Sequence, residues 1–302
     1  MNKLITILGP TASGKTHLAV NLAKEIDGEV ISADSRQAYQ GMDIGTGKDL
    51  DEFTIDGKQI PYHLIDIKKA GYEYNVFEFQ QDFIRVVQGI LKRGKTPILC
   101  GGTGLYLSSA LAKEQLISVP ENKVLREELN LKKKSELIEE LASLKTLRTS
   151  LEATDKERII RALEIEYFKK ENPIAPAMPV LEHTVFGMEV DRSISKEKIT
   201  QRLSERLNQG LVKEVETLLT KGVTTEQLKL YGLEYRFVTE FIEGELNFND
   251  MYQKLNSAIH LFAKKQMTWF RKMQRQGISI HWLHTETSIE EKISTIRKLT
   301  EL

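Results

Sequence analysis

The chain opens with a pattern of apolar positions that changes period within its first 26 residues. Leu4–Leu8 is a short apolar run, and a glycine-rich stretch follows it. After that stretch, apolar residues recur at spacings of three and four: Leu18, Ala19, Leu22, Ala23 and Ile26. The first pattern is typical of a buried strand and the second of an amphipathic helix. The start of the chain therefore predicts strand, loop and helix in succession.

The same alternation continues through most of the chain. Strands are predicted at residues 29–33, 60–67, 97–100, 184–190 and 278–283. Helices are predicted at residues 74–93, from Leu105 onward, and at 196–208, 211–221, 251–276 and 289–299. Strands that alternate with helices favour an α/β fold with a parallel sheet.

One internal segment departs from this alternation. From about Leu116 to His183 no strand pattern occurs, and charged helices are predicted at residues 121–129, 134–144 and 155–170, followed by the proline-rich stretch 173–179. We interpret residues 117–183 as a helical insertion in a core formed by residues 1–116 and 184–302, whose C-terminal part is mostly helical.

Composition narrows the functional classes only a little. The 302 residues are 40% hydrophobic and 28% charged, and Lys+Arg equals Asp+Glu at 43 each, so any nucleic-acid surface must be local. The single cysteine, Cys100, excludes an internal disulfide and, inside an apolar run, is expected to be a buried small hydrophobe. We see no signal peptide and no membrane-spanning run, so we expect a cytoplasmic protein, with a monomer as the default.

The glycine-rich stretch carries the first chemical signal. Residues 9–16 read GPTASGKT and match G-x-x-x-x-G-K-[ST] between a strand and a helix. In such a loop the backbone N–H groups and the helix N-terminus face phosphate oxygens. Lys15 adds a cation, and the Thr16 hydroxyl is placed to ligate Mg²⁺. The predicted phosphate-binding residues are Gly9, Pro10, Thr11, Ala12, Ser13, Gly14, Lys15 and Thr16.

Polar residues follow two further predicted strands. Asp34-Ser35-Arg36-Gln37 comes after one, and Gly101-Gly102-Thr103-Gly104 after the other. Because parallel strands present their carboxyl ends at one edge, these residues are expected beside the phosphate loop. Asp34 could hold Mg²⁺ through water, accept a proton or merely cap a turn, and Thr103 could contact a ligand or only cap a helix.

The predicted helix at residues 251–276 suggests an RNA surface. It contains no acidic residue, and its lysines and arginines interleave with Phe262, Trp269, Phe270 and His260. An isolated charge run is usually a solvated face, but bases combined with aromatic residues favour a nucleic-acid backbone.

The phosphate loop alone suggests a kinase or another nucleotide hydrolase. Most sheet-type members of that class carry an apolar strand ending in Asp for the Mg²⁺ shell, whereas residues 97–100 lead into glycines and a threonine. If Asp34 serves the transferred group instead, the bound phosphates belong to a leaving group. A nucleoside or small-molecule kinase remains the alternative, and a non-catalytic RNA-binding protein is a third.

Several blocks resemble one family, the tRNA dimethylallyltransferases, also called isopentenyl-tRNA transferases. They occur in family order over nearly the whole chain: residues 9–16, 34–48 (DSRQAYQGMDIGTGK), 63–67, 101–106, Arg158 with 161–164, and 263–271 (AKKQMTWFR). The resemblance implies a P-loop NTPase-like parallel sheet core and Mg²⁺ as cofactor. It also implies transfer of a dimethylallyl group from dimethylallyl diphosphate to N6 of the adenosine immediately 3′ of the tRNA anticodon.

The resemblance also assigns roles by position. Asp34 resembles the general base, Thr103 the threonine between the two substrates, and Lys15 the cation on the leaving group; these are the predicted catalytic residues. The insertion is similar to the part that contacts the anticodon stem-loop. The predicted tRNA-binding residues are Asp34, Ser35, Arg36, Gln37, Thr103, Arg126, Glu157, Arg158, Arg161, His260, Lys264, Lys265, Gln266, Trp269 and Arg271.

Three departures from the family pattern concern RNA selection more than chemistry. Ile259-His260 stands where the family usually has Thr-Arg, and Glu234-Tyr235 stands where it has Gly-Tyr. The insertion is short and lacks the usual Asp-Pro segment. These differences are consistent with a divergent second copy of altered tRNA preference.

Overall fold

A computed structural model describes residues 2–144, 155–172 and 178–302. The chain divides into two compact units. The first comprises the residues up to Ala112 together with Pro179–Leu302, and the second comprises Lys113–Met178. The inserted unit thus begins and ends a few residues before the predicted limits of 117 and 183. Residues 173–177 of the proline-rich stretch lie outside the described part of the chain.

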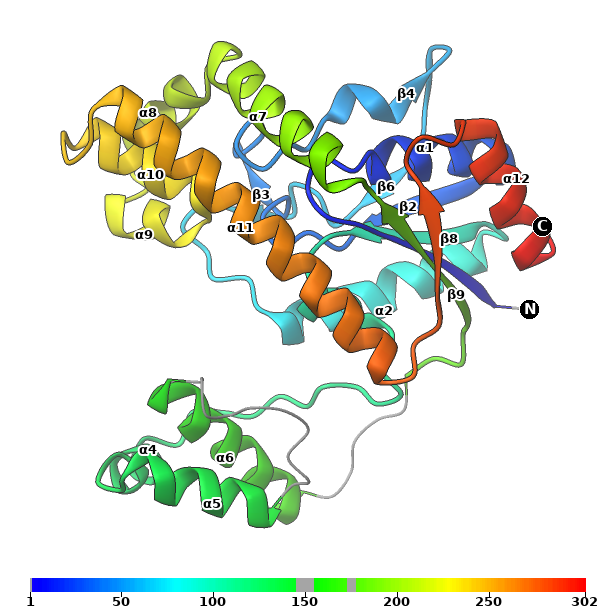
Figure 1. Ribbon diagram of the computed structural model, residues 1–302. Coiled ribbons are helices and arrows are strands. Elements are labelled where there is room, and N and C mark those ends of the chain that lie inside the picture. Colours follow the sequence, from blue (N-terminus) through cyan, green and yellow to red (C-terminus); the bar gives the residue numbers. More distant parts are fainter. Residues whose placement is uncertain (1, 145–154, 173–177) are drawn as a thin grey trace. The chain divides into compact units, whose positions relative to one another are not determined.

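A six-stranded sheet forms the centre of the first unit (Figure 1). Its order is β10 (Ile280–His284), β9 (Glu182–Glu189), β1 (Lys3–Leu8), β8 (Thr96–Gly101), β2 (Gly28–Ser32) and β6 (Tyr62–His63). Every neighbouring pair is parallel. The predicted α/β class is therefore confirmed. β1 lies in the middle, so the loop that follows it opens at the centre of the carboxyl edge, where such sheets bind ligands.

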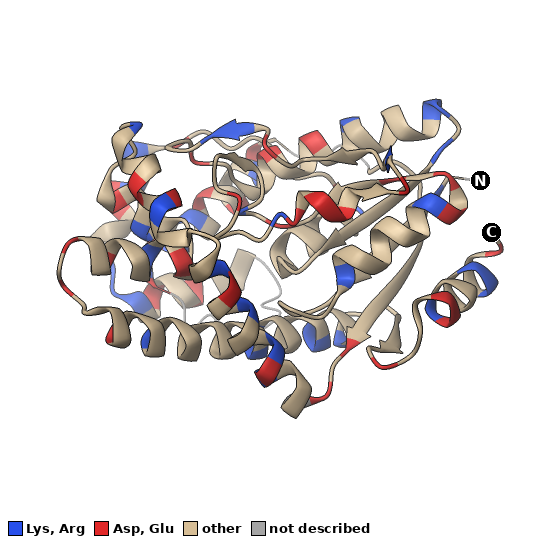
Figure 2. Ribbon diagram, turned by 90° about the horizontal axis from the view of Figure 1, so that it is seen from above, with Lys and Arg blue, Asp and Glu red and all other residues tan. Residues whose placement is uncertain are grey.

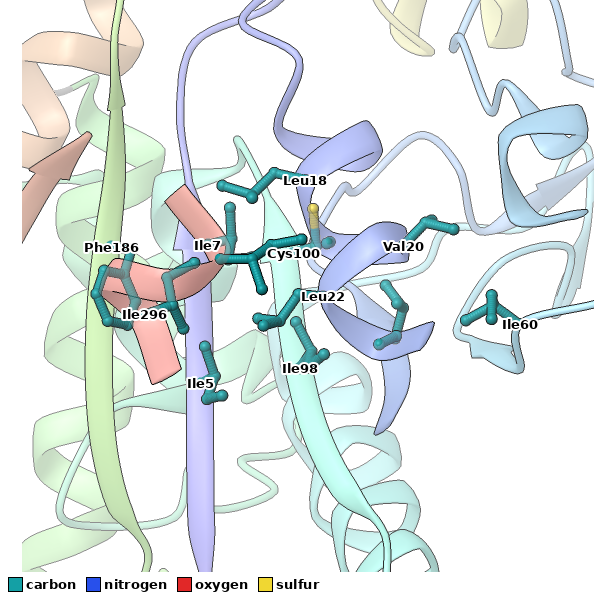
Figure 3. Close-up of a cluster of buried hydrophobic side chains, with 14 of the residues drawn as sticks. Ile5, Ile7, Leu18, Val20, Leu22, Ile60, Ile98, Cys100, Phe186 and Ile296 are labelled. Carbon is teal, nitrogen blue, oxygen red and sulfur yellow. The ribbon is translucent and has the colours of Figure 1, made fainter. Parts of the chain in front are cut away.

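Helices cover both faces of this sheet. On one face, α1 (Lys15–Ile26) and α12 (Ile289–Thr300) pack on Ile5, Ile7 and Ile98. Figure 3 shows Leu18, Leu22 and Ile296 pointing into that cluster, together with Cys100. Cys100 is buried, as expected from its apolar surroundings. The other face is covered by α2 (Val76–Lys92), and α3 (Gly104–Ala110) packs against α2.

The remaining helices of the first unit lie toward the carboxyl edge of the sheet. They are α7 (Arg192–Asn208), α8 (Leu211–Thr220), α9 (Thr225–Leu230), α10 (Leu233–Ile242) and α11 (Phe248–Arg275). The long helix α11 packs against α10, α7 and α3 (Figure 1). Short elements complete the unit: the pair β3 (Tyr39–Gln40) and β7 (Lys68–Lys69), the hairpin β4 (Thr54–Ile55) and β5 (Lys58–Gln59), and the 3₁₀ helix η1 (Leu50–Phe53).

The predicted strand at residues 60–67 is wrong for most of its length. Only Tyr62–His63 pairs with the sheet, through Val30 and Ile31 of β2. The next residue, Leu64, has φ +63°, and Asp66 has φ +56°. Left-handed backbone cannot continue an extended strand, so the chain turns away after two residues.

The described residues of the inserted unit form three helices around a small core. Its helices are α4 (Lys123–Asn130), α5 (Lys134–Leu144) and α6 (Lys156–Glu171), and their buried residues are Leu129, Leu137, Leu141, Ile159, Ile160 and Leu163. Lysines, arginines and acidic residues are interspersed along the helices of the protein (Figure 2). In the described parts of the chain, no helix is long and apolar enough to cross a membrane.

Candidate active site

The loop between β1 and α1 has the geometry that phosphate binding requires. Gly14, the N-cap of α1, has φ +76°, a conformation that glycine adopts without steric cost. The N–H groups in the first turn of α1 and the positive end of its dipole face this loop. Lys15 Nζ lies 3.4 Å from the carbonyl oxygen of Pro10. Burial lowers the pKa of Lys15, and Cys100 and Asp34 oppose that effect.

The loops after β2 and β8 meet beside this loop. Ser35 donates its backbone N–H to Thr103 Oγ1 over 3.1 Å. Thr103 occupies the N-cap position of α3, but its side chain makes no capping hydrogen bond. Asp34 Oδ1 accepts the N–H of Arg36 at 2.9 Å, as in an Asx turn. Asp34 therefore both caps this turn and lies at the site.

Gln37 joins the Asp34 segment to a neighbouring loop. Its Nε2 donates to the carbonyl oxygen of Gly47 at 3.0 Å, and its Oε1 accepts from Ser32 Oγ at 2.8 Å. Ser32 Oγ in turn accepts the N–H of Asp34 at 3.2 Å. Gln37, a predicted tRNA contact, therefore has both ends of its amide engaged within the protein.

Helix α11 contributes another side of the site. Gln266 is buried and bridges the two glycine loops, because it accepts from Thr11 N at 2.9 Å and donates to Gly102 O at 3.0 Å. Trp269 Nε1 donates to Ser108 Oγ at 3.0 Å. Lys264 and Arg271 are exposed on the same helix.

His260 faces α7, with Nε2 3.4 Å from Thr200 Oγ1. Burial lowers the pKa of His260, and Lys196 lowers it further. The lowered pKa favours the neutral form of the ring at physiological pH.

A cavity of about 480 Å³ unites these groups. Lys15, Thr16, Asp34, Thr103 and Trp269 all line it, as do Thr11, Ser35, Arg36, Gln37, Lys265 and Gln266. The cavity is also lined by residues to which the sequence analysis assigned no place in the site: Arg202 and Arg206 from α7, Tyr231 from the end of α9, and Glu234 and Tyr235 from α10. Amphipathic helices carry many polar side chains. The packing of α7 and α10 determines which of them line the cavity.

A second cavity of about 370 Å³ opens on the other side of the phosphate loop. Lys15, Thr16 and Arg202 line both cavities, so the two meet at the phosphate-binding groups. Asp49 and Glu52 face the second cavity. Arg202 pairs with Asp49, and burial raises the pKa of Glu52. The sequence singled out neither carboxylate, because Asp49 precedes and Glu52 lies in the single 3₁₀ turn η1, which is too short to show periodicity.

The four predicted residues of the insertion belong to the second unit. Arg126 and Arg161 both pair with Glu164, whose side chain is 2% exposed. Glu157 is exposed, and Arg158 pairs with Asp155 at its helix end. Two of the arginines thus stabilise the helical core, and Glu157 and Arg158 remain accessible.

The donor set near Thr16 fits a magnesium ion that is bound chiefly through a ligand. Mg²⁺ usually keeps several waters and takes one or two protein oxygens together with substrate phosphates. Thr16 supplies a hydroxyl, and Asp49 and Glu52 face the same cavity. No group of three or more His, Cys, Asp or Glu in the described part of the chain could form a protein-only cage.

The parallel sheet, the glycine loop on its central strand and the carboxylate beside that loop define a P-loop protein built for a phosphorylated ligand. Comparisons with known proteins identify the branch of that class. The IPP transferase family profile matches residues 37–273, and the isopentenyl transferase profile matches residues 2–62. The chain belongs to the IPP transferase family.

Curated relatives and solved structures agree with this membership. The chain is 52% identical over 298 residues to tRNA dimethylallyltransferase 1 of Parabacteroides distasonis, covering 98% of this chain and 97% of the relative. It is 50% identical over 296 residues to tRNA dimethylallyltransferase 2 of Bacteroides fragilis, covering 98% and 97%. The tRNA isopentenylpyrophosphate transferase of Bacillus halodurans superposes with a TM-score of 0.73 at 29% identity, covering 100% of this chain and 96% of that one. A eukaryotic dimethylallyltransferase shares the fold, with a TM-score of 0.80 at 20% identity, covering 99% of this chain and 80% of that one.

Proposed function

We propose that this protein is a tRNA dimethylallyltransferase that modifies N6 of the adenosine immediately 3′ of the anticodon. The observation that carries the proposal is the common cavity of Asp34 and the phosphate loop, in a chain of the IPP transferase family. In the reaction, the N6–C1 bond forms, the bond between C1 and the diphosphate oxygen breaks, and the N6 proton passes to a carboxylate.

The phosphate loop would hold the leaving diphosphate. Lys15 lines the cavity. With the loop amides it would lie where negative charge grows as the C1–O bond breaks, and it would stabilise the transition state more than the ground state. Arg202 lines both cavities and adds a second cation there. Bound Mg²⁺ would neutralise part of the diphosphate charge, with Thr16 as its protein ligand.

Asp34 would act as the general base. The N6 lone pair is conjugated with the adenine ring, so the amine is a weak nucleophile until its proton is removed. The Arg36 amide fixes Oδ1 of Asp34, and Thr103 fixes the adjacent Ser35, so the carboxylate has a defined direction. A base held in this way contributes roughly 10²–10⁴-fold to the rate.

The acceptor adenosine would have to leave its stack to reach this cavity. Phe262 and Trp269 provide apolar walls that limit hydrolysis of the allylic diphosphate. Lys264 and Arg271 on the exposed side of α11, and Glu157 and Arg158 on α6, would contact the anticodon stem-loop. We further propose that the protein acts as a monomer.

Incubation with labelled dimethylallyl diphosphate and unmodified tRNA tests the reaction. We expect label in the RNA, with loss of transfer when EDTA removes Mg²⁺ and recovery when Mg²⁺ is restored. A tRNA whose target adenosine is replaced by guanosine is the matched control and should remain unlabelled. ATP turnover without labelled RNA would instead support the kinase alternative.

A further inference from the structure

Glu234 is a carboxylate in the cavity to which the proposed reaction assigns no role. It lies in the first turn of α10 and lines the cavity with Asp34. Its side chain is 19% exposed, and that of its partner Arg206 is 10% exposed. A buried charge of this kind has a cost, so its contacts are informative.

The partner of Glu234 is held between two acceptors. Arg206 Nη1 lies 3.3 Å from Glu234 Oε1 and 3.4 Å from the carbonyl oxygen of Gly45. A Cβ on Gly47 would lie 1.7 Å from Arg206 Nη2, so only glycine leaves room for the guanidinium there. The Arg206 guanidinium therefore packs closely against the loop of residues 43–47, which we call the Gly45 loop.

Tyr235, the residue after Glu234, is connected to the same loop through Glu214. Tyr235 donates its hydroxyl to Glu214 Oε1 at 2.7 Å, and that oxygen accepts the N–H of Gly45 at 3.0 Å. The loop is joined onward to the base, because Gln37 donates to Gly47 O and Ser32 links Gln37 to the Asp34 amide. The start of α10 is thus connected to the Asp34 segment through hydrogen bonds.

Cationic side chains outnumber acidic ones in the wall of the cavity. The cations that line the cavity, from four different parts of the chain, are Lys15, Arg36, Arg202, Arg206 and Lys265. Among the described residues, the acids that line it are Asp34 and Glu234. Burial raises the pKa of Glu234 and lowers that of Arg206, while each opposes the effect on the other. Asp49 also acts on Arg206, but Asp49 is already paired with Arg202. Without Glu234, Asp34 would be the carboxylate left in the cavity wall to pair with Arg206.

We propose that Glu234 is a positioning residue that holds Arg206 on the Gly45 loop and so keeps the Asp34 carboxylate free to accept the N6 proton. This proposal rests on the proposed transferase function. Removing the negative charge of Glu234 would release a desolvated guanidinium, which would pair with Asp34. Pairing makes a carboxylate a weaker proton acceptor, and so it slows the step that depends on the proton transfer.

The test compares Glu234→Gln, Arg206→Gln and the double variant. From the loss of one buried ion-pair partner we expect Glu234→Gln to lower kcat about tenfold, with little change in KM for either substrate. The acid side of its pH–rate profile should move to lower pH. The double variant removes both charges and should recover to within about threefold of the original kcat. Glu216→Gln, at an exposed ion pair with Lys213 on α8, is the control and should behave as the unchanged protein.

The outcomes distinguish a positioning role of Glu234 from a role in the stability of the fold alone. If Glu234 only supports the fold, the double variant will be at least as impaired as Glu234→Gln, and that result would overturn the proposal. A crystal structure of Glu234→Gln decides the matter even if the unchanged protein transfers no dimethylallyl group, a result that would overturn the proposed function alone. Arg206 turned to Asp34 supports the arrangement, and Arg206 still on Gly45 contradicts it.

Discussion

Ser35 and Thr103 are 68 residues apart in the sequence, yet the backbone N–H of Ser35 donates to Thr103 Oγ1 over 3.1 Å. The bond joins the loops that follow β2 and β8, which are neighbours in the sheet. The hydroxyl that lines the cavity therefore also fixes the residue next to Asp34.

Replacement of Thr103 by alanine should lower kcat for dimethylallyl transfer about tenfold, because small displacements of a catalytic group are costly. The Ser35 amide would lose its acceptor, and Asp34 would lose part of its support. Thr103→Ser keeps the hydroxyl and should retain most of the activity in the same labelled-tRNA assay. Equal losses in both variants would show that the methyl group matters, not the hydrogen bond.

Asp34→Asn should lower kcat by roughly 10²–10⁴-fold, because asparagine cannot accept the N6 proton. The substitution is nearly isosteric, and its amide oxygen can still accept from Arg36 N. Filter binding should therefore show tRNA affinity within about threefold of the original, as expected when an interaction made only in the transition state is removed. Near-normal turnover by this variant would remove Asp34 from the role of base.

Gln266→Ala should destabilise the fold itself. The change leaves the N–H of Thr11 and the carbonyl of Gly102 without their partner in a buried place, which costs about 1–3 kcal/mol. Differential scanning calorimetry should show a lower Tm, and KM for dimethylallyl diphosphate should rise as the phosphate loop loosens. Gln274→Ala, at an exposed position of the same helix, serves as the comparison. An unchanged Tm for Gln266→Ala would mean that the bridge carries no stability.

Acid should weaken the inserted unit through Glu164. Burial by itself would raise the pKa of Glu164, but hydrogen bonds from Arg126, the Asn122 amide and Arg161 outweigh it and lower the pKa to about 2. Since the value in the unfolded chain is about 4.5, the stabilisation is complete above that pH and is lost as pH falls from 4.5 toward 2. The difference corresponds to roughly 3 kcal/mol.

Hydrogen exchange of the full chain, corrected for intrinsic rates, should therefore show less protection of α4 and α6 at pH 3 than at pH 6. Glu164→Gln should reduce protection at both values, whereas Glu139→Gln, at an exposed position on α5, should not. Equal protection of the original protein at pH 3 and pH 6 would contradict the assignment to Glu164.

The sequence predicted the parts of the fold whose signals are local. The phosphate loop, the strand before it, the helix after it and helix α2 with its buried Phe79 and Phe83 each carry their pattern within 20 residues. Asp34 and Thr103 could be placed at one sheet edge because parallel strands share a direction. The strand expected at residues 60–67 failed, since apolar content gave no sign that Leu64 and Asp66 adopt left-handed backbone.

The half of the site that comes from α7 and α10 could not be predicted in this way. Arg202 and Arg206 are spaced four apart on a helix with charges all round, which specifies no partner. Glu234 was visible only as a departure from a family pattern, with no indication of what it contacts. Its pairing with Arg206 depends on how two helices pack, which a one-dimensional pattern does not encode.

Cys100 lies in the core behind the phosphate loop, with Sγ 3.6 Å from the carbonyl oxygen of Lys15, and burial raises the pKa of its thiol to about 12. A thiol-specific reagent needs both access and a thiolate, so it can react only during moments when strand β8 separates from α1. Because the chain has one cysteine, the rate at which a thiol reagent labels it measures how often this local opening occurs. A bound diphosphate should lower the labelling rate of Cys100 without contacting its sulfur atom.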